Sequence, residues 1–323
     1  MRIFRYIPVL ICLPLLFGCS SAGNIEEKET DKINVVCTVF PEYDWAREIA
    51  GDTDSSDITF IADNGTDFHS YQPGTQDIVT VTSCDVLVYV GGQSDKWIED
   101  ALKNKSNPDM QVVKLTDVMK DGLLSEPETQ GEDHDHEHEH GEEEHAFDEH
   151  VWLSLKNAVT FTEAIAEAFC TADPENADSY RKNAEAYVAQ ISEMDRDFTE
   201  NVQNAKRKTV LFGDRFPFVY LMNDYGIEYY AAFPGCSSET DASFDTVVSL
   251  AEEVDREELP CVLTIEKSDC NIADAVISNT KSKDQKILTL DSMQIARRDE
   301  IDAGKTYLSV MKNNLDVLLE ALD

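Results

Sequence analysis

Five of the seven histidines in this chain lie in one acidic run at residues 131–145. The run reads GEDHDHEHEHGEEEH, and its histidines are His134, His136, His138, His140 and His145. Neutral imidazole is a good ligand for zinc, copper and nickel, and the interleaved carboxylates raise the local concentration of cations. The run lacks apolar residues, so burial cannot offset the entropy of ordering it. We therefore expect a disordered loop that collects divalent metal as an auxiliary site; a solvated acidic linker is the simpler alternative.

The other two histidines, His69 and His150, are the candidates for a buried metal site. His69 follows the second predicted strand, and in open α/β sheets ligands bind beyond the carboxyl ends of the strands. His150 lies in the segment DEHVWLS, where the acidic run re-enters the folded part of the chain. Two such histidines in a chain with a metal-collecting run indicate one shared site.

Short apolar runs of the strand type alternate with helical patterns in two similar halves. The predicted strands are 33–40, 57–62, 86–91 and 110–115 in the first half, and 209–214, 228–233, 261–266 and 286–291 in the second. Helical patterns between them include 43–50, 94–102, 216–225, 243–253 and 271–282. This alternation predicts an α/β fold of two lobes, each with a four-stranded, mostly parallel sheet flanked by helices.

The clearest helical pattern joins the two halves. Asp173 and Pro174 are a typical helix start, with Asp as N-cap and Pro at the first helical position. Apolar residues then recur at spacings of three and four through Val202. We expect one long rigid helix, 173–206, between an N-terminal lobe at 33–172 and a C-terminal lobe at 207–323. The N-terminal lobe includes the disordered loop, placed at 125–147. A coiled-coil partner is the alternative use of the apolar stripe.

The first residues predict export and a lipid anchor. Residues 1–19 combine two arginines with an apolar run that is too short to span a bilayer, which is typical of a signal peptide. The run ends in LFGC, which resembles a bacterial lipobox and makes Cys19 the predicted lipidation site. Residues 20–32 are polar and read as a flexible tether. We therefore expect an extracytoplasmic protein anchored to the cell membrane.

The composition narrows the possible partners. The net charge of −37 argues against nucleic acid and favours cations, and 42% hydrophobic residues suffice for real cores. The cysteines form no CxxC pair, so a zinc ribbon or a thioredoxin-like site is not expected. There is also no HExxH or GxSxG motif, which makes a zinc hydrolase an unfavoured alternative.

Three motifs and the long helix carry a resemblance to a known family. The motifs are TVFPEYDWAREIAG at 38–51, FHSYQPGTQDI at 68–78 and EHVWLSLKNA at 149–158. In this order they resemble the solute-binding lipoproteins of zinc and manganese ABC importers, the ZnuA/TroA-like family. The resemblance implies two α/β lobes bridged by one rigid helix, a metal in the cleft between them, and a membrane permease as partner. We also expect a monomer that is not an enzyme. Some members are described as adhesins, but no residue here indicates that role.

The resemblance also assigns metal ligands. His69 and His150 match the first two family histidines, and Asp291 matches the final carboxylate. The third histidine falls on Gly213, which has no side chain. Glu239, Cys236 and Asp214 are the replacements in order of preference; the alternative role of Asp214 is a local ion pair with Arg215 or a hydrogen bond that supports a ligand. The histidine-rich run favours zinc as cargo, and manganese is the alternative.

Overall fold

Two parallel four-stranded sheets carry the fold, in the strand orders β2-β1-β3-β4 and β6-β5-β7-β8. The computed structural model describes residues 32–127, 147–236 and 242–323. The first sheet contains β1 (Ile33–Cys37), β2 (Ser56–Phe60), β3 (Val86–Tyr89) and β4 (Gln111–Lys114). The second contains β5 (Thr209–Phe216), β6 (Glu228–Pro234), β7 (Cys261–Ile265) and β8 (Lys286–Leu290). The predicted two-lobe α/β architecture is confirmed.

Central strands of both sheets are buried on both faces, as helices on either side of a parallel sheet require. β3 and β7 consist entirely of buried residues. The helices of the first lobe are α1 (Phe40–Ala50), α2 (Thr75–Ser83), α3 (Lys96–Leu102), α4 (Leu115–Met119) and α5 (Leu155–Ala172). The second lobe contains α7 (Val219–Tyr225), α8 (Phe244–Arg256), α9 (Asn271–Asn279), α10 (Arg298–Asp302) and α11 (Tyr307–Leu322). Short 3-10 turns occur at η1 (Phe68–Ser70), η2 (Lys120–Gly122) and η3 (Val151–Leu153).

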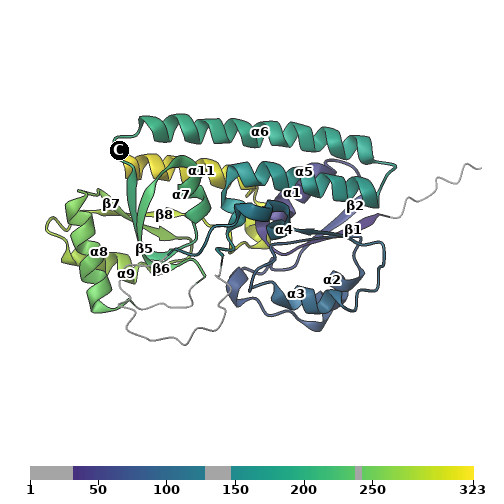
Figure 1. The fold of residues 1–323 in the computed structure, drawn as a ribbon, viewed down its shortest axis with the longest axis horizontal. Helices are drawn as coiled ribbons and strands as arrows, with labels where there is room; N and C mark the ends of the chain where they lie inside the picture. Colours follow the sequence, from purple (N-terminus) through teal and green to yellow (C-terminus); the bar gives the residue numbers. More distant parts are fainter. Residues whose placement is uncertain (1–31, 128–146, 237–241) are drawn as a thin grey trace, which may run out of the picture. The chain divides into compact units, whose positions relative to one another are not determined.

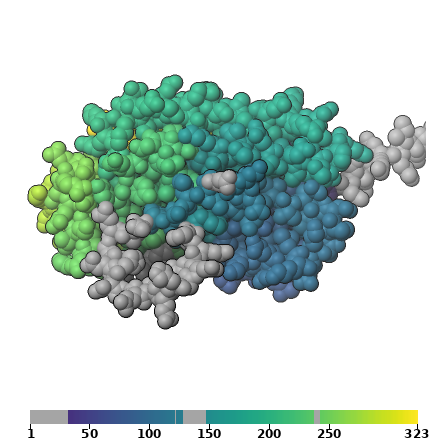
Figure 2. Space-filling model, viewed as in Figure 1, coloured from purple at the N-terminus to yellow at the C-terminus, as the bar shows by residue number. Residues whose placement is uncertain are grey.

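The long helix α6 (Ala177–Asn204) packs against elements of both lobes. It contacts α5 and α1 on one side and α11 and α7 on the other, and Figure 1 shows it running beside α5 and α11. Its apolar stripe is buried, with Tyr180, Ile191 and Phe198 fully enclosed. Figure 2 shows the surface of α5 and α6 as a continuous teal band along one side of the described unit. The apolar stripe of α6 therefore packs against the two lobes of its own chain.

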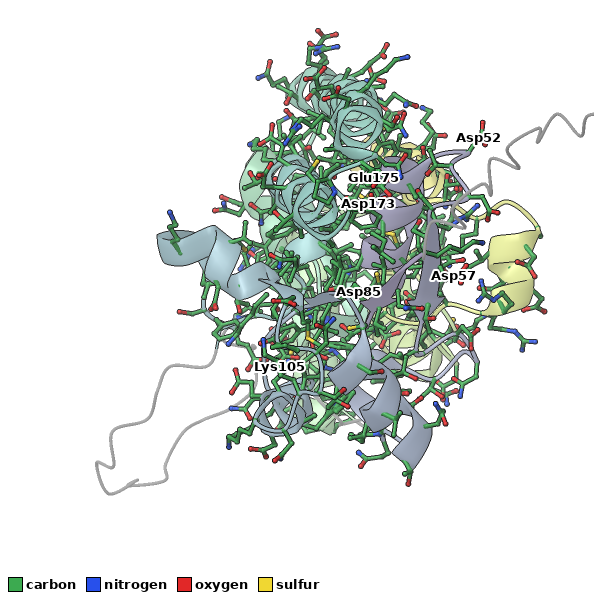
Figure 3. The ribbon with its side chains drawn as sticks, turned by 90° about the vertical axis from the view of Figure 1, so that its right-hand side faces the viewer. Asp52, Asp57, Asp85, Lys105, Asp173 and Glu175 are labelled. Atoms are coloured by element: carbon green, nitrogen blue, oxygen red, sulfur yellow. The ribbon has the colours of Figure 1, made fainter. Side chains whose placement is uncertain are left out.

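The predicted start of this helix at Asp173 is wrong. Asp173 instead follows the last turn of α5, where its N–H donates to the carbonyl of Phe169 at 2.8 Å. Its Oδ2 accepts hydrogen bonds from Asn176 Nδ2 and Tyr180 Oη, both at 2.7 Å. The carboxylate thus stabilises the turn between two helices, next to Glu175 in Figure 3.

The chain after β8 returns to the first lobe and ties the lobes together. Three backbone hydrogen bonds join residues 63–68 to residues 294–298: Arg298 N to Asp63 O at 2.8 Å, Gly65 N to Ala296 O at 3.1 Å, and Phe68 N to Gln294 O at 3.1 Å. The segment that carries His69 is therefore held against the segment that follows the last strand.

Several predicted features lie outside the described residues. These are the export signal with Cys19, the tether up to residue 31, and the histidine-rich run with His134, His136, His138, His140 and His145. Among the residues that the structure does describe, no helix combines the length and apolar character needed to cross a membrane.

Candidate metal centre

His69, His150 and Cys236 converge on one point from three different loops. A ring nitrogen from each histidine and the Cys236 Sγ all lie within 4.8 Å of one another. The Nε2 atoms of the two histidines are 2.9 Å apart. In the described part of the chain this is the one group of three or more His, Cys, Asp or Glu side chains with metal-ligand spacing. His69 follows β2, His150 immediately precedes η3, and Cys236 follows β6.

His69 is positioned by its neighbours on both the backbone and the ring. Asp67 is the N-cap of η1, and its Oδ1 accepts the His69 N–H at 2.9 Å. Ser94 Oγ lies 2.9 Å from His69 Nδ1 and donates its single proton to Glu149 Oε2 at 2.6 Å. The serine oxygen must therefore accept a hydrogen bond from the Nδ1–H of His69. This leaves the Nε2 lone pair of His69 facing the cluster.

His150 is fully buried, and its tautomer is fixed in the same way. Asp148 Oδ1 accepts both the backbone N–H and the Nδ1–H of His150, each at 2.9 Å. The Nε2 lone pair of His150 then also faces the cluster. Two such lone pairs 2.9 Å apart repel each other unless a cation or a proton lies between them. The geometry therefore suits a shared metal ion.

Burial and the neighbouring charges give the two rings different pKa values. Burial is the main cause that lowers the pKa of His69 to about 3, followed by the charge of His150. Burial also lowers the pKa of His150, but the Asp148 carboxylate and Gln294 outweigh this effect and raise it above 6.5. One imidazole is therefore held neutral, while the other can carry a proton when metal is absent.

Cys236 completes the group because the preceding residue is glycine. A Cβ at Gly235 would lie 2.8 Å from His150 Cε1 and 2.8 Å from Pro217 Cα, closer than atoms can pack. Only glycine lets the backbone approach His150 here. Burial, followed by the charges of Asp148 and Glu149, raises the pKa of the Cys236 thiol. A metal must therefore displace a proton to bind this sulfur.

Gln294 also reaches the site, and the sequence analysis missed it. Its Oε1 lies 3.2 Å from His150 Nε2, and the side chain is buried. Its Nε2 has no hydrogen-bond partner among the described residues. Glutamine is uncharged and an uncommon metal ligand, so residue type gave no signal. Its place shortly after the last strand was the available clue.

The predicted ligand Asp291 is wrong, because the structure does not bring it into the cluster. Its Oδ2 pairs with Lys305 Nζ at 2.8 Å, and its Oδ1 accepts the Met293 N–H at 2.8 Å. Its backbone N–H and carbonyl both bond the Asn314 side chain, at 2.9 and 2.8 Å. Asp291 thus organises the turn after β8 and is neutralised by a lysine.

The structure also explains the glycine at position 213. A Cβ there would lie 2.7 Å from Ala273 Cα in α9 and 2.9 Å from Val262 Cγ1, so no side chain fits. The Oδ1 of Asp214 accepts the Arg215 N–H at 2.8 Å, and its Oδ2 lies 3.4 Å from the Ile265 N–H. Asp214 is therefore outside the ligand group, and the Arg215 guanidinium pairs with Asp67 instead of Asp214. Glu239 lies outside the described residues and stays a prediction.

Comparisons with known proteins agree with this architecture. The profile of the family described as ZnuA, zinc-uptake complex component A, periplasmic, matches residues 35–321. The zinc-binding lipoprotein AdcA of Streptococcus pneumoniae R6 is 29% identical over 97% of this chain. The high-affinity zinc uptake system protein ZnuA of Bacillus subtilis is 26% identical, covering 97% of this chain and 96% of its own length. This chain spans 60% of the length of AdcA.

Solved structures share the fold. The Zn(II)-bound AdcA of Streptococcus pneumoniae superposes with a TM-score of 0.71 at 25% identity, covering 90% of this chain and 58% of AdcA. The metal-dependent lipoprotein YcdH of Bacillus subtilis has a TM-score of 0.73 at 24% identity, covering 90% of this chain and 99% of its own. The second likeness concerns the fold alone.

Proposed function

Because the chain belongs to the family of periplasmic zinc-uptake components, we propose that it is a solute-binding protein whose cargo is Zn²⁺. The observation that carries this proposal is the convergence of two imidazole nitrogens and one thiol within 4.8 Å. Their orienting partners, Ser94 and Asp148, leave both imidazole lone pairs directed at the same point. Such a group binds a metal ion with little rearrangement.

We assign the ligands as His69 Nε2, His150 Nε2, Cys236 Sγ and Gln294 Oε1. Zinc in proteins is usually bound by four ligands at roughly 2.0–2.3 Å. Tetrahedral bonds of about 2.0 Å to two nitrogens place those atoms ~3.3 Å apart. The observed 2.9 Å therefore needs to widen by only a few tenths of an ångström. We also propose Glu239, three residues after Cys236 in sequence, as a further ligand candidate.

The donor set favours zinc over manganese. Thiolate sulfur and imidazole nitrogen are preferred by zinc, whereas manganese prefers carboxylate and water oxygens. Asp291, the carboxylate that would have supported manganese, is paired with Lys305 outside the group. The single amide oxygen of Gln294 does not reverse this preference.

Delivery completes the proposed role. We infer an extracytoplasmic protein that is anchored through a lipid on Cys19 and hands zinc to the permease of an ABC importer. The histidine-rich run at 131–145 then acts as a low-affinity collector that raises the zinc concentration near the cleft. We expect the protein to work as a monomer, because the proposed ligands all come from one chain.

Metal titration with matched variants tests this proposal. Protein purified without chelators is expected to bind one zinc tightly and several weakly, measured by competition with a zinc chelator. Deleting residues 131–145 removes only the weak sites. In that background, His69→Ala/His150→Ala abolishes the tight site, whereas Asp291→Asn, outside the ligand group, leaves it intact. Loss of tight binding on the deletion alone, or its survival in the double variant, contradicts the proposal.

A further inference from the structure

A positively charged side chain stands beside the proposed cation site. Arg215 lies in β5, just past the irregularity in its pairing with β6 between Phe212 and Arg215. Burial contributes most to the low pKa of His69, and the Arg215 charge is among the further causes that lower it. A guanidinium on a neighbour of a metal ligand weakens cation binding by repulsion, so its presence needs another explanation.

Asp67 links Arg215 to His69. Its Oδ1 accepts the His69 N–H at 2.9 Å, while its Oδ2 accepts Arg215 Nη2 at 2.9 Å. The Asp67 and Arg215 side chains are 17% and 20% exposed, so water screens this pair less than a surface pair. The Asp67 carboxylate thus binds the His69 segment through one oxygen and Arg215 in the second sheet through the other.

The His69 segment is therefore held from two directions. Phe68 N donates to the Gln294 carbonyl at 3.1 Å, which fixes the segment to the returning chain after β8. Arg215 holds it from the carboxyl end of β5, an inner strand of the second sheet, through Asp67. Movement of β5 away from the first lobe would pull on Asp67 and disturb the position of the His69 ring.

We propose that Asp67 and Arg215 form a clamp between the lobes that positions His69 and slows the release of bound zinc. This inference rests on the proposed function, because it assigns Arg215 as a positioning residue for that same site. The clamp compensates for the charge of Arg215: the guanidinium repels the metal, but it also holds the carboxylate that orients a ligand.

The two effects of Arg215 have opposite signs, which makes the proposal testable. If repulsion dominates, Arg215→Gln releases zinc more slowly than the parent protein. If the clamp dominates, Arg215→Gln and Asp67→Asn each release zinc about five to ten times faster, and the double variant is no faster than the worse single one. Additive effects, or slower release from Arg215→Gln, overturn the proposal.

A matched control separates the clamp from a general charge effect. Lys267 lines the same 400 Å³ cavity as Arg215 and Asp67, but its ammonium pairs with Glu300 at 3.0 Å. Lys267→Gln removes one positive charge near the cleft without touching the His69 loop. It is expected to leave the release rate unchanged or slightly lower. Faster release from Lys267→Gln, equal to that from Arg215→Gln, contradicts the clamp.

The measurement is the slow phase of zinc release from the full chain into excess chelator. The Co²⁺-substituted protein provides a second readout, since the absorption band of a cobalt–thiolate bond reports Cys236 coordination. The clamp predicts that Arg215→Gln keeps this band while release accelerates. A parent protein without a slow phase refutes the proposed function itself. If the parent protein shows a slow phase but Arg215→Gln does not release zinc faster, only the clamp is refuted.

Discussion

Glu42 is a buried acid whose ionisation is expected to limit the stability of the N-terminal lobe. The side chain is fully enclosed in α1. Its Oε2 accepts the backbone N–H groups of Thr38 and Val39 at 2.8 and 3.2 Å, while its Oε1 has no partner among the described residues. The Thr38 hydroxyl lies within 3.4 Å of both Glu42 Oε2 and Asp95 Oδ2, so a second buried acid is close by.

Burial, followed by the charge of Asp95, raises the pKa of Glu42 from 4.5 to about 8. Since the folded pKa exceeds the unfolded one, the folded state holds this proton more tightly. The resulting stabilisation is complete below pH 4.5 and is lost as the pH rises through about 8. For these two pKa values the loss between about pH 6 and about pH 9 is roughly 2–3 kcal/mol.

Urea unfolding of the metal-free protein between pH 6 and pH 9 measures this loss. Glu42→Gln cannot ionise, so its unfolding free energy should fall less over this range, by the roughly 2–3 kcal/mol worked out above. The amide places a donor where Oε1 has no partner, which costs a similar amount at every pH. The change of the unfolding free energy with pH is therefore the informative quantity. Glu48→Gln, on the exposed face of α1, is the control and should keep the parental slope. A parental slope in Glu42→Gln refutes the reasoning.

Three further predictions concern the metal centre. Cys236→Ser should weaken zinc about 100-fold but manganese far less, as measured by competition between the two metals, because only zinc gains strongly from thiolate. Zinc binding at pH 8 should release about one more proton per zinc from the parent protein than from Cys236→Ser, because the raised pKa keeps the thiol protonated. Calorimetry in buffers of different ionisation enthalpy counts these protons. Gly235→Ala should weaken zinc about 10- to 100-fold in the chelator assay by displacing His150, whereas Gly74→Ala, whose added Cβ would lie 3.4 Å from Asp77, should not.

Periodicity and strand-like runs were sufficient to predict the architecture. All eight predicted strands exist within a few residues of their expected bounds, because strands of a parallel sheet are buried runs that interrupt helical patterns. The apolar stripe of α6 was equally clear. The predicted start of α6 was wrong, because an Asp-Pro pair also suits a tight turn between two helices. Asp173 has that role. The helix α11 was missed although Thr306 caps it and its apolar residues recur at helical spacing.

The site was predictable only as far as residue type indicates metal binding. His69 and His150 stood out because the chain has so few histidines outside the acidic run. Asp291 was misassigned because the end of a strand identifies a neighbourhood without fixing which side chain faces the cleft. Lys305, from a later part of the chain, forms an ion pair with the Asp291 carboxylate. Gln294 carried no chemical signal, and only the tertiary structure places it beside His150.

The tripeptide Asp148-Glu149-His150 shows why one short motif can build most of the site. His150 supplies a ligand nitrogen, and Asp148 fixes its tautomer through Nδ1. Glu149 acts on the other ligand: it accepts a hydrogen bond from the Ser94 hydroxyl, so that Ser94 must accept a hydrogen bond from the Nδ1–H of His69. Consecutive residues that point in different directions thus orient two imidazoles that are 81 positions apart in sequence. In their neutral forms both rings then present unprotonated Nε2 atoms, the state that zinc requires. Changing either carboxylate should therefore weaken zinc binding without removing a ligand.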